Sequence, residues 1–286
     1  MRRLTLPLAV LAAFAGTAPA HATFPGKNGR IAVAAKGESL RAIITLAPAG
    51  SGRGRDVKFL RDCQLDENGE PESGDCEIGY DSPAWAATGR RLAFDAGPRI
   101  ALINSDGTAF RSLGTPGGAG EPAQSPRGKA IAFTAQVNGR QRDLLVRGML
   151  NGASRVIVRN ARAPDWSVRD LIAFERDGTI FSVNRRGGDL RRIARGRSPS
   201  WSPSGRSLAF SRRDGIYVAR ADGKRVRRAV RCSGCQTPAV SPDGRLVVYK
   251  HRGLVVARLS DGRRSRTLIQ DAPGTFSVSQ PSWQPR

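Results

Sequence analysis

The feature that most constrains the fold of this chain is a hairpin-like motif that recurs from residue 83 to the C-terminus. Its clearest copy is PSWSPSGRSLAF at residues 199–210, in which a short strand carrying Trp201 leads through a turn into an apolar strand ending in Phe210. Proline at the second position of a type I turn pre-sets φ, and glycine is favoured at the fourth position. Because one two-stranded hairpin is only marginally stable in water, the recurrence of the motif carries the information about the fold.

The copies share a proline at the start and an aromatic residue at the end. The interval between the two is eleven residues in four copies and ten residues in the copy at Pro164, which has lost the glycine turn. Two further strand-like runs follow each copy, so one unit holds four strands with a period of 35–43 residues. This period and strand count are typical of a β-propeller blade. The full copies run over Pro83–Phe94, Pro122–Phe133, Pro164–Phe174, Pro199–Phe210 and Pro238–Tyr249.

The two ends of the chain determine the number of blades. Residues 30–34, 41–46 and 57–60 form a set of strands without a first strand, whereas residues 281–285 repeat only a first strand. Joining these ends completes a sixth blade and removes the open edge that a linear array would leave. We therefore predict an all-β, six-bladed β-propeller over residues 23–286, closed by the C-terminal strand. Blade 1 is expected from residues 24–60 plus 281–285, and blades 2–6 are expected to start near residues 83, 122, 164, 199 and 238.

The motif resembles the TolB-like β-propeller repeat, a WD-repeat-like unit written P-x-W-S-P-D-G-x-x-[IL]-A-[FY]. The copies at residues 199–210 and 238–249 match it best, and the copy at Pro83 has Ala86-Ala87-Thr88 in place of Ser-Pro-Asp. The resemblance covers nearly all of residues 24–286 and implies the fold. TolB itself adds an N-terminal α/β domain, and prolyl-oligopeptidase-like enzymes add a hydrolase domain. This sequence has room for neither, so we expect a propeller alone.

Residues 1–22 have the pattern of a signal peptide. Arg2 and Arg3 precede an apolar run from Leu4 to Ala15, and Ala20-His21-Ala22 is a small-x-small cleavage site. The apolar run is short for a membrane span, and no later segment is apolar enough to cross a bilayer. We expect export of a mature chain that starts near Thr23 to an extracytoplasmic location (secreted, periplasmic or attached to the envelope), with an uncleaved anchor as the alternative.

The chain is strongly basic, with a formal charge of +23. Arginine makes up 41 of its 47 basic residues, which suits the recognition of carboxylate or phosphate groups. Arginine-rich codon usage in a GC-rich genome would give the same composition. An exported protein meets little nucleic acid, so the expected partner is a protein or an anionic envelope polymer, and the chain is expected to be a monomer.

Four cysteines in an exported chain indicate disulfide bonds. Pairing along the sequence gives Cys63–Cys76 and Cys232–Cys235, one of three connectivities. The Cys-Ser-Gly-Cys spacing of the second pair also occurs in redox motifs, but those usually lie at a helix N-terminus, and the flanks here are strand-like. Zinc is disfavoured because His251 is the only histidine after residue 22.

An acidic insertion is predicted at residues 61–82. Residues 62–81 hold eight of the 24 acidic residues, and Cys63 and Cys76 bracket most of them. Alternating oxygen donors at Asp66, Asn68, Glu70 and Glu72 would allow a calcium loop, but the helix-loop-helix pattern of such loops is missing. A solvated acidic loop without metal is therefore the prediction.

No catalytic residues and no cofactor are predicted. The nearest match to a nucleophile elbow, residues 196–200, lacks the final glycine, and any catalytic triad would depend on His251. The four tryptophans share one repeat position on the innermost strands. Packing between adjacent blades explains them better than sugar stacking does. These residues are Trp85, Trp166, Trp201 and Trp283.

One face of the ring is the predicted interaction surface. Arginines of the fourth strands lie at the outer edges of the blades, where charge prevents pairing with other chains. A site is instead expected where the fourth-to-first connections and the second-to-third turns open. The function predicted is non-catalytic binding through this face, and the alternative is a hydrolase or lyase acting on a sugar or lactone with carboxylates of the face. The candidate face residues are Asp66, Glu67, Glu70, Glu72, Arg212, Arg213, His251 and Arg252, beside the Cys232–Cys235 loop.

Overall fold

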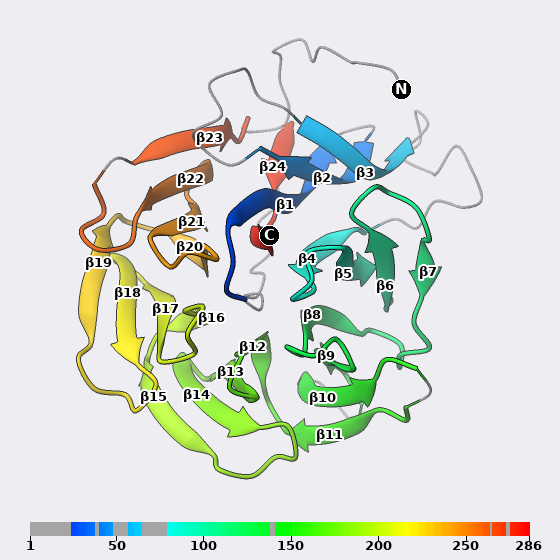
Figure 1. The fold of residues 1–286 in the computed structure, drawn as a ribbon, viewed down its shortest axis with the longest axis horizontal. Helices are drawn as coiled ribbons and strands as arrows, with labels where there is room; N and C mark the ends of the chain where they lie inside the picture. Colours follow the sequence, from blue (N-terminus) through cyan, green and yellow to red (C-terminus); the bar gives the residue numbers. More distant parts are fainter. Residues whose placement is uncertain are drawn as a thin grey trace.

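The chain folds as a ring of six antiparallel β-sheets around a common axis, as Figure 1 shows. The structure is a computed structural model that describes residues 24–37, 40–47, 57–64, 79–137, 141–150, 152–263, 265–272 and 275–286. Every regular element in these ranges is a strand, and they contain no helix long and apolar enough to cross a membrane. The predicted all-β, six-bladed propeller is confirmed.

Blades 2–6 each contain four consecutive strands, ordered from the axis of the ring outward. Blade 2 contains β4 (Asp81–Trp85), β5 (Arg91–Ala96), β6 (Arg99–Asn104) and β7 (Arg111–Ser112). Blade 3 contains β8 (Gly120–Gln124), β9 (Ala130–Ala135), β10 (Asp143–Gly148) and β11 (Arg155–Val158). Blade 4 contains β12 (Arg162–Trp166), β13 (Leu171–Arg176), β14 (Thr179–Asn184) and β15 (Arg191–Arg195). Blade 5 contains β16 (Arg197–Trp201), β17 (Ser207–Arg212), β18 (Gly215–Arg220) and β19 (Arg227–Arg231). Blade 6 contains β20 (Gln236–Val240), β21 (Leu246–Lys250), β22 (Gly253–Arg258) and β23 (Arg266–Gln270).

Blade 1 combines both ends of the described chain. Its N-terminal part is β1 (Asn28–Gly37), β2 (Leu40–Leu46) and β3 (Val57–Gln64). Two C-terminal strands, β24 (Phe276–Val278) and β25 (Ser282–Pro285), pair antiparallel with β1 and close the ring. The C-terminal contribution thus begins before the predicted start at Pro281, and β3 ends after the predicted residue 60.

The tryptophans connect the innermost strands of neighbouring blades. All four are at most 2% exposed and lie on β4, β12, β16 and β25. The Trp201 Nε1–H donates a hydrogen bond to the Asp165 carbonyl oxygen at 3.1 Å, and the Trp283 Nε1–H donates to the Ala239 carbonyl at 3.1 Å. Each of these two bonds crosses from one blade to the preceding one, so the indoles of Trp201 and Trp283 satisfy their only donor between blades.

The closing strand also binds the next blade. The Gln284 side chain accepts a hydrogen bond from the Arg30 N–H at 3.1 Å and donates one to the Gly89 carbonyl at 2.7 Å. Lys36 of β1 forms an ion pair with Asp81 of β4, with 2.8 Å between Nζ and Oδ2. Blade 1 is therefore held to blade 2 at both ends of its inner edge.

A pair of equivalent glycines tests this closure. Gly89 and Gly128 occupy the same turn in blades 2 and 3, both with a φ of +65°. A Cβ at Gly89 would lie 2.1 Å from the Pro285 carbonyl oxygen, whereas a Cβ at Gly128 would meet no atom within 4 Å. Gly128→Ala is expected to cost about 1–2 kcal/mol of unfolding free energy from backbone strain. Gly89→Ala is expected to cost about 1–3 kcal/mol more, because the closing strand must move. Urea unfolding of both variants measures the difference, and equal losses would contradict the contact.

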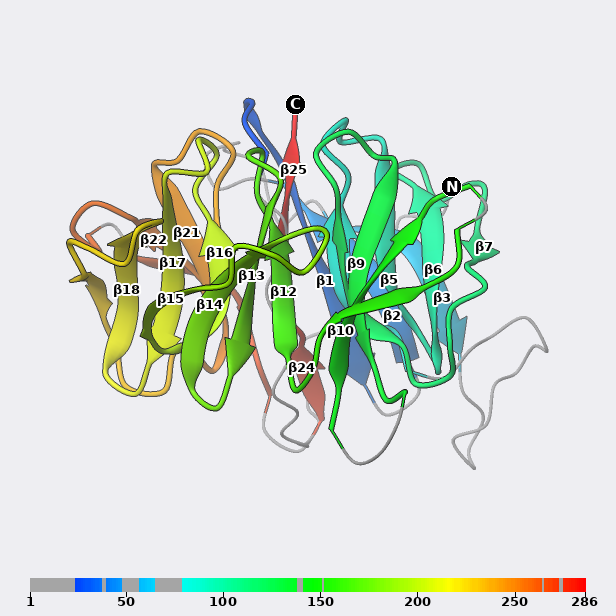
Figure 2. The same cartoon turned by 90° about the horizontal axis from the view of Figure 1, so that it is seen from below.

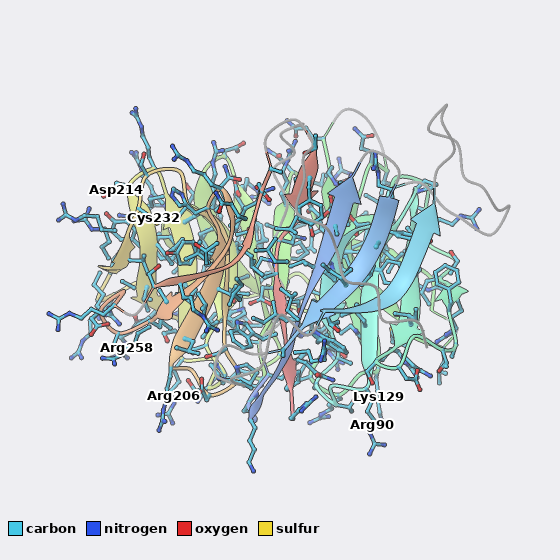
Figure 3. The ribbon with its side chains drawn as sticks, turned by 90° about the horizontal axis from the view of Figure 1, so that it is seen from above. Arg90, Lys129, Arg206, Asp214, Cys232 and Arg258 are labelled. Carbon is cyan, nitrogen blue, oxygen red and sulfur yellow. A yellow bond between two sulfur atoms is a disulfide. The ribbon has the colours of Figure 1, made fainter. Side chains whose placement is uncertain are left out.

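The ring has two distinct faces. We call the one formed by second-to-third turns and fourth-to-first connections the connection face, and the one formed by first-to-second and third-to-fourth turns the hairpin face. Figure 2 shows the strands running between the two faces, with the C-terminus at the hairpin face. Figure 3 shows Asp214 and Cys232 at the connection face and Arg90, Lys129 and Arg206 at the opposite one.

Candidate functional site

A pocket of about 430 Å³ lies on the connection face, lined by residues of blades 3–6. Its walls come from the start of the innermost strands and the end of the second strands. In five blades the residue before the repeat proline has a left-handed φ between 45° and 59°, and the pairing with the second strand shifts register there. Proline disfavours the right-handed helical region at the preceding residue but favours extended backbone there, so the proline alone does not account for the left-handed φ. The bent residues are Ser82, Glu121, Ala163, Ser198 and Thr237.

Three of the N–H groups at these bends donate to carboxylates of the preceding blade. Asp95 Oδ1 accepts the Glu121 N–H at 2.8 Å, and Glu121 Oε2 accepts the Ala163 N–H at 2.9 Å. Glu175 Oε2 accepts the Ser198 N–H at 3.4 Å. Three carboxyl groups therefore connect blades 2, 3, 4 and 5 in sequence around the axis, and the last two line the pocket.

Burial raises the pKa of all three carboxyl groups. The neighbouring Asp81 and Glu121 raise the pKa of Asp95 further, to well above its usual range. For Glu121, burial outweighs the opposing effects of Arg142 and of the hydrogen bond from Ala163. For Glu175, burial outweighs the opposing effects of the Ser198 hydrogen bond and of Arg197, so its pKa is also raised. These carboxyls therefore keep a proton to higher pH than exposed ones do.

Arginines edge the pocket beside these carboxyls. Arg162 and Arg197 are exposed, and both occupy the first position of an innermost strand, in blades 4 and 5. Arg197 Nε lies 3.7 Å from Glu175 Oε1, a loose ion pair. On the other side, Thr237 is 4% exposed, and its hydroxyl has no hydrogen-bond partner among the residues that the structure describes. The pocket thus offers cationic groups at its edge and buried polar groups inside, a combination suited to an anionic, hydroxyl-bearing ligand.

The described residues among those predicted for the face, Arg212, Arg213, His251 and Arg252, lie on the connection face but do not line this pocket. Cys232 and Cys235 form a disulfide, and Gly234 between them donates its N–H to the Arg213 carbonyl at 3.0 Å. His251 and Arg252 form the second-to-third turn of blade 6. Four predicted face residues and Cys76, and with it the predicted Cys63–Cys76 pairing, lie outside the residues whose side chains are described. The four are Asp66, Glu67, Glu70 and Glu72. In the part of the chain that is described, no group of three His, Cys, Asp or Glu residues could hold a metal ion.

Arg212 stacks on aromatic rings of its own blade and donates a hydrogen bond to the preceding blade. Its guanidinium carbon lies 4.3 Å from the Tyr217 ring centroid and 5.2 Å from that of Phe210, and its Nε donates to the Arg195 carbonyl at 2.9 Å. Arg176 makes the equivalent stack on Phe174 in blade 4, at 5.4 Å. Arg212 is therefore better explained by cation–π packing than by ligand binding.

The pocket residues escaped the sequence-based prediction, although the repeat contains a signal for them. Arg162 and Arg197 stand two residues before the repeat proline, Glu121 and Thr237 stand one residue before it, and Glu175 directly follows the core aromatic of its copy. Proline and aromatic stay constant across the copies while these positions change. The sequence signal for the pocket is therefore the set of variable positions just before the repeat proline and directly after the core aromatic.

No family model matches the sequence, and no curated protein matches it. Among solved structures, TolB from Acinetobacter baumannii is similar over 90% of this chain and 67% of its own, with a TM-score of 0.72 and 19% identity. A TolB candidate from Agrobacterium tumefaciens is similar over 91% of this chain and all of its own (100%), with a TM-score of 0.66 and 17% identity. An oligogalacturonate lyase from Vibrio parahaemolyticus is similar over 88% of this chain and 79% of its own, with a TM-score of 0.52 and 13% identity.

These similarities confirm the TolB-like propeller as the fold of this chain. At such low identity they speak to the fold alone, because one fold hosts many functions. The residues of the connection face are the features of this chain that bear on its function.

Proposed function

We propose that this chain is an exported, non-catalytic propeller that binds an anionic envelope polymer through its connection face. The observation that carries the proposal is the pair of exposed arginines, Arg162 and Arg197, beside a buried polar pocket in a chain of charge +23. Guanidinium groups pair with carboxylate or phosphate oxygens through two parallel hydrogen bonds. The basic net charge would also draw a polyanion towards the protein.

Two observations support export. Residues 1–22 have the pattern of a signal peptide, although they lie outside the described residues. The Cys232–Cys235 disulfide is of a kind that persists in oxidising compartments and is rare in the cytosol.

A polymer fits the surface better than a protein partner does. The centres of protein interfaces are enriched in aromatic side chains and depleted of charge. Among the described residues, the exposed large apolar side chains are five aliphatic ones, and none of the five lines the pocket. They are Val137, Leu150, Val156, Leu190 and Val226.

Binding to polymers of defined charge tests the proposal. The chain from Thr23 onward is expected to bind polygalacturonate or polyphosphate and not neutral dextran, as measured by interferometry at fixed salt concentration. The double variant Arg162→Gln/Arg197→Gln is expected to bind at least about tenfold more weakly, since two charged contacts are lost. The matched control Arg90→Gln/Arg206→Gln removes the same charge from the hairpin face and should retain near-normal affinity.

Equal losses in the two double variants would show that binding follows net charge, which contradicts a site on the connection face. If none of the polymers binds and crosslinking in an envelope extract captures one protein through this face, the polymer proposal fails in favour of a protein partner.

A second candidate function rests on the two carboxyls of the pocket. Glu121 and Glu175 both have a raised pKa and stand beside arginines, an arrangement that can supply a general acid. A propeller hydrolase or lyase acting on an acidic sugar is therefore the alternative, and the lyase from Vibrio parahaemolyticus has the same fold. Turnover of an oligosaccharide or lactone panel that is abolished by Glu175→Gln would favour the enzyme over the binding protein.

A further inference from the structure

We propose that the pocket on the connection face receives one carboxylate-bearing sugar residue, such as a uronic acid, with its carboxylate between Arg162 and Arg197 and a hydroxyl on Thr237. The inference rests on the proposed polymer-binding function and names the part of the polymer that is recognised.

The two arginines form a repeated cationic pair. Arg162 and Arg197 stand at equivalent positions of adjacent innermost strands, β12 and β16. Their side chains therefore approach the pocket from neighbouring blades. The contact of Arg197 with Glu175 is long, at 3.7 Å, and the Arg197 side chain remains 67% exposed. A ligand carboxylate can replace this loose contact at little cost, since exposed ion pairs contribute little.

The inside of the pocket matches a sugar hydroxyl. Thr237 lines the pocket, and its Oγ1 is one of the buried polar atoms without a partner among the described residues. A buried hydroxyl left unpaired costs free energy, and a ligand hydroxyl would recover it. Glu175, whose side chain is 17% exposed, stands beside Arg197 as a further acceptor or, when protonated, as a donor.

The lining also argues against other carboxylates. A peptide C-terminus would bring an aliphatic or aromatic side chain, which needs an apolar subsite. Ala163 is the only apolar side chain among the residues that line the pocket, and Gln141, Asn160 and Gln236 supply amide groups instead. The volume of about 430 Å³ lies within the range of small-ligand pockets, roughly 300–1,000 Å³.

Calorimetric titration with trigalacturonate tests this assignment, with neutral galactotriose as the control sugar. The wild-type chain is expected to bind trigalacturonate and not galactotriose, and Arg197→Gln is expected to lower the affinity at least about tenfold. Thr237→Val is expected to lower it several-fold. Thr275→Val is the matched control, because Thr275 is also buried with an unpartnered Oγ1 but does not line the pocket. Thermal unfolding of each variant verifies that it is folded.

Equal binding of the two sugars, or equal affinities in the Thr237→Val and Thr275→Val variants, would overturn the assignment. If polyphosphate binds in an Arg162- and Arg197-dependent manner but trigalacturonate does not, the sugar acid is wrong and the proposed function stands. If no anionic polymer binds, the proposed function itself fails.

Discussion

Replacing Trp283 with alanine is expected to lower the free energy of unfolding by about 3–5 kcal/mol, as is typical for a fully buried aromatic residue. Trp283 is 2% exposed, packs in the cluster that joins blades 1 and 6, and donates its indole N–H to Ala239 of the neighbouring blade. The substitution removes both contacts from the strand that closes the ring. Chemical unfolding followed by far-ultraviolet circular dichroism measures the loss.

Leu190→Ala provides the control for this measurement. Leu190 is 53% exposed, so its truncation should change the stability by no more than about 0.5 kcal/mol. Similar losses in the two variants would mean that the C-terminal strand does not close the ring as described.

Replacing Asp165 with serine is expected to stabilise the protein by about 1–3 kcal/mol at pH 8, the cost of a buried polar group left unsatisfied. Asp165 lies on β12 with no exposed surface. One carboxyl oxygen accepts the Trp201 N–H, and the other has no hydrogen-bond partner within the described part of the chain. Ser200 and Ser282 stand at the equivalent positions of blades 5 and 1, and each accepts the corresponding N–H at 3.1–3.2 Å. The repeat therefore shows that serine satisfies this position.

The gain should depend on pH. Burial raises the pKa of Asp165 well above the ordinary value of 3.8, so between these two values the folded state binds more protons than the unfolded state. The stability of the wild-type protein therefore falls as the pH rises through this interval. The advantage of Asp165→Ser should be absent below the ordinary pKa and complete above the raised one. Unfolding in urea at several pH values checks this, and a gain or loss that is the same at every pH would contradict it.

The sequence allowed the architecture to be predicted because most copies keep the same residue types at the same positions. The proline follows the bend at the start of the innermost strand, the tryptophan of four blades is buried on that strand, and the aromatic residue enters the core. The unmatched first strand at Pro281 predicted the ring closure, since β25 pairs with β1 in the structure. The repeat motif could not predict β24, because residues 276–278 precede the motif and have no counterpart in the other copies.

The sequence predicted the face of the ring on which the candidate site lies, but none of the residues that line the pocket. The pocket depends on where left-handed residues before the proline direct their N–H groups, and a pattern of residue types does not contain that geometry. Glu121 and Glu175 look like exposed strand residues in the sequence, and only the register between blades shows that they accept hydrogen bonds from Ala163 and Ser198. Arg212, by contrast, was predicted as a surface residue, and its stacking on Tyr217 required a three-dimensional structure.

The carboxyls of the ring connect its architecture with its function. Asp95 lies between blades 2 and 3, is partly exposed, and accepts the Glu121 N–H. Glu175 occupies the same position in blade 4, is also partly exposed, and forms a loose ion pair with Arg197. The two positions differ in the neighbouring first-strand residue, which is Gly120 in blade 3 and Arg197 in blade 5.

Hydrogen–deuterium exchange with and without polygalacturonate locates the surface through which the polymer binds. We expect slower exchange on addition of the polymer in peptides that cover residues 160–163, 175–178 and 196–198. Peptides over residues 86–90 and 202–206 on the hairpin face should be unchanged. Protection confined to the hairpin face or to the outer strands, with polymer demonstrably bound, would contradict binding through the connection face.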